Sequence, residues 1–263
     1  MKTEEQSKVD GLFNLRNDHL RKLQDTFELD ALGVKRLEKM IQSLVKPIAT
    51  QSRLQAALQH ELAYTAGMTR NLQQALAKLT ISRNLGLDDF SVSLSRSHIL
   101  MMNGRYSDCA DLLRTQLQTG PSAAQIPFLI PHMLQIGMIE TAKALMPVDS
   151  TDGILVTNIT LILGDIGAGE HQLTERLDYA ARMVMEFAPH PILAFNMLAD
   201  RDEGILYQFI VDAGPEALAR LEDRIIDGLV DNFEGPLDGV LAIGVAPFLP
   251  GESARGKAYS VRI

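Results

Sequence analysis

The chain has 263 residues, of which 46% are hydrophobic and 22% are charged. This composition is typical of a folded protein with a sizeable core and excludes a disordered chain. The chain has no tryptophan and only 5% aromatic residues, which favours packed helices over a β-sandwich. Its single cysteine excludes an intramolecular disulfide and a cysteine-based zinc site.

Charge is distributed unevenly along the chain. Residues 1–84 carry a net charge of +4, whereas residues 145–253 combine five arginines with 19 acidic residues, a net charge of −14. An acidic surface serves solubility, but it also attracts basic partners and repels nucleic acids and anionic lipids. We therefore expect no binding to nucleic acid or membrane. No apolar run reaches the ~18 residues of a membrane span, and no secretory signal follows Met1, so we expect a cytoplasmic protein.

An N-terminal helical hairpin is predicted over residues 1–48. Apolar residues recur at spacings of three and four from Phe13 to Ile48, interrupted by Arg16 and Asp30. Residues 29–33 form a plausible break, with Gly33 ending the first helix. The stripe fits a core-facing surface better than an oligomer seam, because its register is short and broken. Oligomerisation through these helices is the alternative.

Further helices are predicted along the next hundred residues. Residues 51–79 read as one helical tract bent at Gly67, and Asp88 reads as the N-terminal cap of a helix that begins near Phe90. Residues 154–163 are rich in β-branched side chains and fit either a strand or a buried helix. Their helix-rich neighbours favour a helix.

A recurrent pattern lies between residues 90 and 147. Its first copy has a turn glycine, an aromatic residue, a small residue, a large apolar residue and a closing proline at Gly104, Tyr106, Cys109, Leu113 and Pro121. The glycine permits the turn, and the small residue lets two helices cross closely. Cys109 is therefore expected to be a buried, inert packing residue.

A second copy follows at a period of 33 residues, with Gly137, Ile139 and Ala142 in the corresponding places. Pro127 and Pro131 lie early in its first helix, which should start late or be kinked. The pattern resembles the tetratricopeptide repeat, a helix–turn–helix unit of about 34 residues. The resemblance implies stacked hairpins that form a concave surface for a peptide or another protein. Its repeat determinants would be Gly104, Tyr106, Gly137 and Ala142.

The predicted fold is thus all-α: a degenerate array of tetratricopeptide-like hairpins over residues 49–233, followed by a small cap over residues 234–263. The segment 234–236 breaks the last helix. Residues 240–245 and 258–263 then read as short strands around a loop, so the cap is expected to contain a hairpin or other extended structure.

The sequence motifs for phosphate binding, metal binding and catalysis are incomplete. The glycine spacing of residues 164–169 matches a phosphate-binding loop, but Glu170 stands where a lysine is required, so a connecting loop is expected. His60 and Glu61 begin a zincin motif whose second histidine is missing. Residues 200–203, rich in acids, read as the solvated start of a helix rather than a cation site. No catalytic residue, metal site or cofactor is predicted.

The sequence therefore predicts a non-catalytic interaction protein, such as a scaffold or chaperone, whose acidic second half binds a basic segment of another protein. Asp165, Glu170, Glu175 and Asp178 are the candidate contacts, because they are acidic and lie near a loop. Two alternatives remain open. One is a structural homo-oligomer built through the N-terminal helices, and the other is an enzyme of unfamiliar type with a site around residues 235–251.

Overall fold

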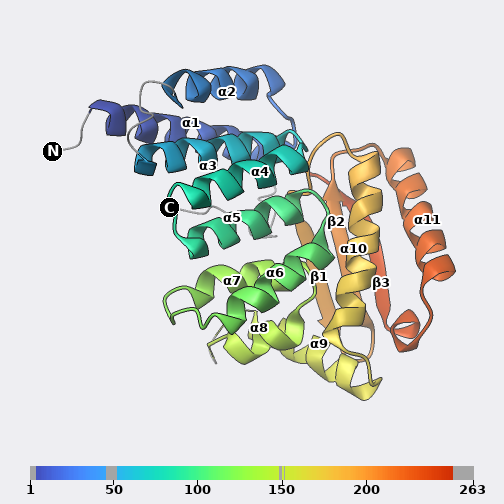
Figure 1. Cartoon of the computed structure of the whole chain (residues 1–263). Coiled ribbons are helices and arrows are strands. Elements are labelled where there is room, and N and C mark those ends of the chain that lie inside the picture. The colour runs from blue at the N-terminus through green and yellow to red at the C-terminus, as the bar shows by residue number, and fades with distance from the viewer. Residues whose placement is uncertain (1–3, 46–51, 148–149, 151, 251–263) are drawn as a thin grey trace. The chain divides into compact units, whose positions relative to one another are not determined.

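The computed structural model describes residues 4–45, 52–147, 150 and 152–250. Within these residues the chain forms two compact units, with the boundary between Asn103 and Gly104. The fold is mainly helical, and a three-stranded sheet lies in the second unit (Figure 1). The segment boundaries expected at residues 48 and 233 stay predictions.

The first unit consists of helices packed against each other. In chain order they are α1 (Glu4–Thr26), α2 (Ala31–Val45), α3 (Ser52–Met68), α4 (Leu72–Asn84) and α5 (Asp89–Met102). The predicted N-terminal hairpin is α1 and α2. Its apolar stripe faces the core of the unit, because Val9 and Leu12 of α1 pack with Leu37 and Ile41 of α2 and with leucines of α3.

The break between α1 and α2 differs from the prediction. Phe27 ends α1 with a φ of 56°, and its N–H donates to the Leu23 carbonyl at 2.8 Å. Asp30 then caps α2 by accepting the Gly33 N–H at 2.8 Å. Gly33 therefore lies in the first turn of α2 instead of ending α1, because a capping aspartate three residues earlier starts the helix there.

The tract predicted as one bent helix is two helices, α3 and α4. The chain turns two residues after α3 ends, at Arg70, whose φ is 63°. The next helix begins as expected, since Asp88 caps α5 by accepting the Ser91 N–H at 2.8 Å.

The second unit combines helices with the sheet. Its elements are α6 (Tyr106–Gln118), α7 (Ile126–Gln135), α8 (Ile139–Leu145), α9 (Gly153–Asp165), α10 (Glu170–Phe187), β1 (Phe195–Asp200), β2 (Gly204–Val211), α11 (Pro215–Asn232), the 3-10 helix η1 (Pro236–Gly239) and β3 (Leu241–Pro247).

The helix over residues 154–163 is confirmed as α9. Gly137 turns the chain between α7 and α8 with a φ of +83°. Pro127 lies in the first turn of α7 and Pro131 inside it, as expected.

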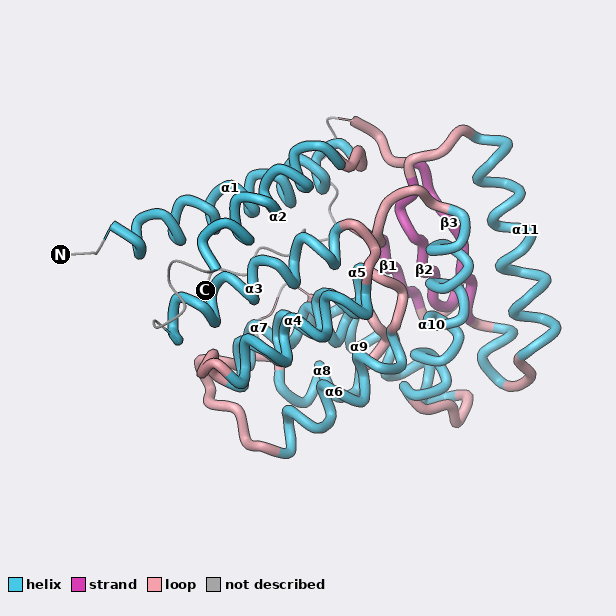
Figure 2. Tube along the Cα trace, turned by 45° about the horizontal axis from the view of Figure 1, so that its top comes forward, coloured by secondary structure: helices cyan, strands magenta, loops and turns pink. Residues whose placement is uncertain are grey.

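The all-α prediction holds in part, because the fold is mainly helical but its sheet begins upstream of the expected cap. The strand order of the sheet is β1-β2-β3 (Figure 2). Strands β1 and β2 are antiparallel, and β2 and β3 are parallel. Residues 201–203 are the turn of the β1–β2 hairpin, not a helix start, and Gly204 follows with a φ of +94°. The predicted strand at residues 240–245 is confirmed as β3. The hairpin is formed upstream of the expected cap, and residues 258–263 lie outside the described residues.

One face of the sheet anchors the predicted repeats of the second unit. Tyr106, at the start of α6, lies 3.4 Å from the Tyr207 hydroxyl of β2 and accepts a hydrogen bond from Gln135 of α7 at 3.1 Å. Its ring also packs against Phe209, with 6.1 Å between centroids. The aromatic residue of the repeat pattern is therefore buried against a strand.

In the part of the chain that the structure describes, no single helix is long and apolar enough to cross a membrane. The adjoining helices α9 and α10 meet the length and composition criteria as a pair, but they are bent by 108° where they meet.

Candidate functional site

Two of the four predicted contact residues are engaged in helix capping. Glu170, the first residue of α10, accepts the Thr141 N–H at 2.9 Å and the Thr141 hydroxyl at 2.5 Å. Asp178, two turns later, accepts the Ser107 N–H at 2.9 Å and pairs with Arg182 at 2.8 Å. These N–H groups belong to the first turns of α8 and α6, which have no partner within their own helices.

The same helix lies against both repeat turns. A side chain at Gly104 would meet Met185 and the Ala181 carbonyl of α10 at 2.7 and 2.9 Å, and one at Gly137 would meet Leu173 at 3.0 Å. The turn glycines are thus required by close approach as well as by their positive φ. Helix α10 therefore covers the turns on which the repeat resemblance depends.

The other two predicted residues lie elsewhere. Asp165 is exposed and pairs with Arg201 of the β1–β2 turn at 3.1 Å, and Glu175 is exposed on α10. The structure does not bring the four carboxylates together into one docking surface. Their role in binding stays a prediction.

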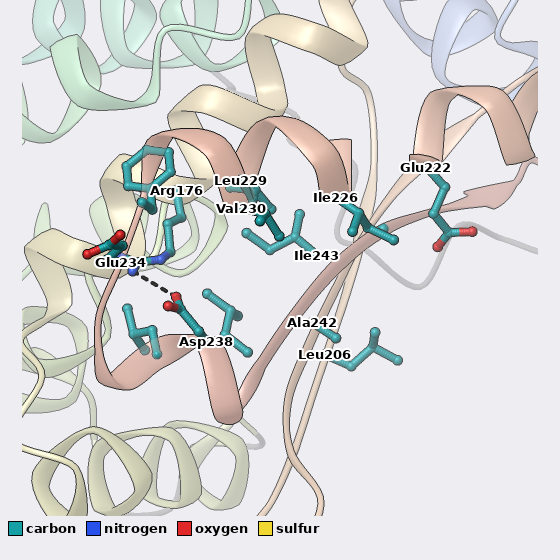
Figure 3. A pocket seen from close by; sticks show the side chains of 14 residues that line it. Arg176, Leu206, Glu222, Ile226, Leu229, Val230, Glu234, Asp238, Ala242 and Ile243 are labelled. Atoms are coloured by element: carbon teal, nitrogen blue, oxygen red, sulfur yellow. Dashed lines mark hydrogen bonds and ion pairs between the residues drawn. The ribbon is translucent and has the colours of Figure 1, made fainter. Parts of the chain in front are cut away.

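A cavity of about 490 Å³ lies between α11, η1 and β3. This volume is in the range of sites for small ligands or a few side chains. Helix α11 supplies one wall, with Ile226 and Val230 one turn apart, and both side chains are exposed, at 49% and 72%. Ile243 of β3 and Leu206 of β2 supply apolar surface on the strand side (Figure 3).

Charged groups stand at the two ends of this cavity. At one end Arg176 of α10 pairs with Asp238 at 3.1 Å, beside the exposed Glu234, and stacks over the Phe233 ring at 5.0 Å. At the other end lies Glu222, as Figure 3 shows. We call the cavity with these end groups the α11 groove. It offers apolar contact in the middle and an acidic side chain at each end.

The amino-acid pattern of α11 carries a signal for the α11 groove that was not among the sequence predictions. Helix α11 has two apolar faces. Leu218, Leu221, Ile225 and Gly228 are buried, and Gly228 approaches Tyr179 of α10 so closely that a side chain there would lie 2.6 Å from its hydroxyl. A helix that packs on one side needs only one apolar face. The second apolar face of α11, with Ile226 and Val230, therefore indicates a further contact.

A cluster of polar and charged side chains is buried in the first unit. Glu61 Oε1 lies 3.1 Å from His60 Nδ1, and His60 Nε2 lies 2.8 Å from Ser95 Oγ. This carboxylate–imidazole–hydroxyl order is that of a serine nucleophile relay. However, Ser95 has no exposed surface, and Glu61 also binds Arg16 of α1 at 2.8 Å. The arrangement therefore serves as a buried polar network rather than as an accessible catalytic site.

Protonation in this buried network follows from its surroundings. Burial opposes the charge of Glu61, but Arg16 and His60 outweigh it and lower the pKa of this carboxyl to about 2. Burial, assisted by the charge of Arg16, lowers the pKa of the neighbouring His98 to about 4. Glu61 is therefore charged and His98 neutral at pH 7.

The single cysteine behaves as predicted. Cys109 has no exposed surface, and burial raises the pKa of its thiol. Among the residues that the structure describes, no group of three or more His, Cys, Asp or Glu side chains is placed to hold a metal ion.

Comparison with known proteins found no similar family model, no similar curated protein and no similar solved structure.

Proposed function

We propose that the chain is a non-catalytic protein–protein interaction module, and that its α11 groove takes a basic, partly apolar segment of another protein. The observation that carries this proposal is the second apolar face of α11. Val230 is 72% exposed and Ile226 49% exposed beside a cavity, where a surface helix normally carries polar side chains. An exposed apolar patch next to a cavity marks an interaction site.

Charge supports a basic partner. Residues 212–238 contain eight acidic residues and two arginines. Glu222 and Glu234 lie at the ends of the α11 groove, so a cationic side chain at each end of the bound segment would be paired. Such pairing raises the association rate and suppresses partners of the wrong charge.

The tetratricopeptide-like arrangement and a cytoplasmic location belong to the same proposal. The hairpins with turns at Gly104 and Gly137 would act as the rigid frame that holds α10, and α10 in turn supports α11 through Gly228. The docking surface would then be the α11 groove rather than the concave face usual for such repeats.

A random-peptide display library tests the proposal. We expect the full chain to enrich peptides that combine basic and apolar residues, with affinity that falls as salt is added. Val230→Asp should abolish this enrichment without unfolding the chain, since the side chain is exposed. Leu32→Asp is the matched control, because Leu32 is also 72% exposed but lies on α2. Equal enrichment by the Val230→Asp variant would sink the proposal.

The enzyme alternative has a specific observation in its favour, because the α11 groove includes Leu237, Asp238 and residues 241–244 of the region where an unfamiliar active site was expected. Its lining in the described part of the chain is apolar or charged, without a hydroxyl, thiol or imidazole side chain. This lining of described residues offers no serine, cysteine or histidine nucleophile, and its mainly apolar wall favours binding.

A further inference from the structure

The α11 groove follows the backbone of β3. Four consecutive residues of this strand, Leu241, Ala242, Ile243 and Gly244, line the cavity. Successive side chains of a strand point to opposite faces of the sheet. A cavity on one face alone would meet the side chains of only every second residue, so the cavity lies at the edge of β3 and reaches from there over the face that carries Ala242 and Leu206.

That edge presents backbone hydrogen-bonding groups. The Ile205 N–H of β2 donates to the Val240 carbonyl at 2.7 Å, and the Phe248 N–H donates to the Val211 carbonyl at 3.0 Å. In a parallel ladder alternate residues of a strand bond to the same neighbour. The even-numbered residues of β3 therefore direct their backbone N–H and C=O groups toward β2. The odd-numbered residues Leu241, Ile243 and Val245 direct these groups away from β2, toward the open edge. Within the described ranges, β3 has a strand neighbour on one side only.

The length of the α11 groove sets the length of its occupant. Glu222 and Glu234 are 12 residues apart along α11 and the residues that follow it. A helix rises 1.5 Å per residue, so the helical part from Glu222 to Asn232 spans about 15 Å. An extended segment covers this length with about five or six residues, at ~3.3 Å each.

From the edge, the apolar wall and the acidic ends we infer that the partner segment adds to the sheet as a strand along β3. This inference rests on the proposed function and specifies its binding mode. The segment is extended, is about five or six residues long, and has a basic residue at each end near Glu222 and Glu234. Its apolar side chains pack on Ile226 and Val230 of α11. Backbone pairing supplies affinity, while the alternate side chains and end charges supply specificity.

N-methylation of the peptide tests this binding mode without changing the protein. The probe is the peptide most enriched by the full chain from the display library, resynthesised with one backbone nitrogen methylated at a time. Strand addition predicts that methylation at alternate positions weakens binding about tenfold or more, while the positions between are tolerated, because only every second N–H pairs with β3.

A protein variant gives an independent readout. Ile243→Pro removes the outward N–H of β3, and a proline is tolerated where that group is not used by the sheet. Ile243→Ala is the matched control, since it also loses the buried isoleucine side chain but keeps the N–H. We expect the proline variant to bind the peptide about tenfold more weakly than the alanine variant. Both variants are first compared by circular dichroism, and the methylated peptides decide the question if either one fails to fold.

The outcomes separate the two proposals. If no library peptide binds the full chain, the proposed function fails. If peptides bind and respond to Val230→Asp but tolerate methylation at every position, the function stands and strand addition is overturned. Two further results would also overturn strand addition by a partner, because each would show that another segment occupies the edge of β3. These are preferential binding of a synthetic peptide of residues 251–263, and a dimer that dissociates on Ile243→Pro.

Discussion

Two buried arginines mark the difference between the two units. Arg16 in the first unit and Arg176 in the second are 1% and 6% exposed, and each pairs with a carboxylate and stacks on an aromatic ring. Their partners differ. The Glu61 side chain is 4% exposed, whereas that of Asp238 is 53% exposed at the end of a cavity.

This difference separates a structural ion pair from one that can serve binding. The Arg16–Glu61 pair is closed on every side by its own network, so its charges depend on each other for compensation. The Arg176–Asp238 pair has one partner in contact with water, so its contribution to stability is small and its carboxylate is available to a ligand. The same two residue types therefore have different uses, set by access to solvent.

Glu61→Ala should have the largest effect. It leaves the Arg16 guanidinium buried without its counter-charge, and breaking such a pair costs about 3–5 kcal/mol. Chemical denaturation followed by circular dichroism measures the loss. The control is Arg83→Ala, which breaks the exposed pair with Asp89 at 2.6 Å and should cost about 0–1 kcal/mol. Equal losses in the two variants would contradict the comparison.

Acid should destabilise the first unit next most strongly. His98 has a pKa of about 4 in the folded chain and about 6.5 when unfolded, so the unfolded chain binds more protons between these values. The contribution of the neutral His98 to the free energy of unfolding is fully present above pH 6.5 and is lost as the pH falls to 4. Because the pKa of Glu61 is lowered in the folded chain, protonation of this carboxyl causes a second loss of stability below pH 4.5. Unfolding free energies measured across this range should show a shallower slope between pH 6.5 and 4 for His98→Gln.

Capping by α10 is expected to have an intermediate effect. Asp178→Ala leaves the Ser107 N–H without its acceptor and should cost about 1–2 kcal/mol. Glu175→Ala, on the exposed side of the same helix, should stay within about 0.5 kcal/mol. Labelling of Cys109, the chain's only cysteine, reads out opening near α6 directly. Faster labelling of the Glu175 variant than of the Asp178 variant would rule out the capping role.

Asp238→Asn should have the smallest effect. Arg176 and the Gly235 N–H donate to different oxygens of Asp238, so the amide of asparagine keeps one of these acceptors and loses the other. The lost charge is half exposed and water can reach the site, so a change of at most about 1 kcal/mol is expected. Thermal unfolding measures it. A loss as large as that of Glu61→Ala would show that Arg176 is structural in the same way as Arg16.

Local signals explain the parts of the fold that could be predicted. Asp88 as a cap, Gly104 and Gly137 as turns, and the apolar stripe of α1 and α2 each depend on residues within a few positions of one another. Strand β2 was missed although Ile205, Tyr207 and Phe209 alternate toward the core, because the acidic residues before it resemble a helix start.

The parts that could not be predicted depend on distant partners. Arg16 interrupts the apolar stripe of α1, and nothing near it indicates that Glu61 lies opposite, 45 residues away. The carboxylates of Glu170 and Asp178 look like free acidic groups until the N–H groups of α8 and α6 are placed beside them. The α11 groove likewise requires α10, β2, α11 and β3 to meet.

The order of capping along the chain has a consequence for biosynthesis. The acceptors for the first turns of α6 and α8 are on α10, which leaves the ribosome after both helices. Until α10 emerges, those N-terminal N–H groups are satisfied only by water, and the turn glycines face no partner. A nascent chain that ends before α10 should therefore hold loose hairpins, which become fixed together when residues 170–187 are released. The first turns of α6 and α8 are thus expected to gain their side-chain caps only after α10 has been translated.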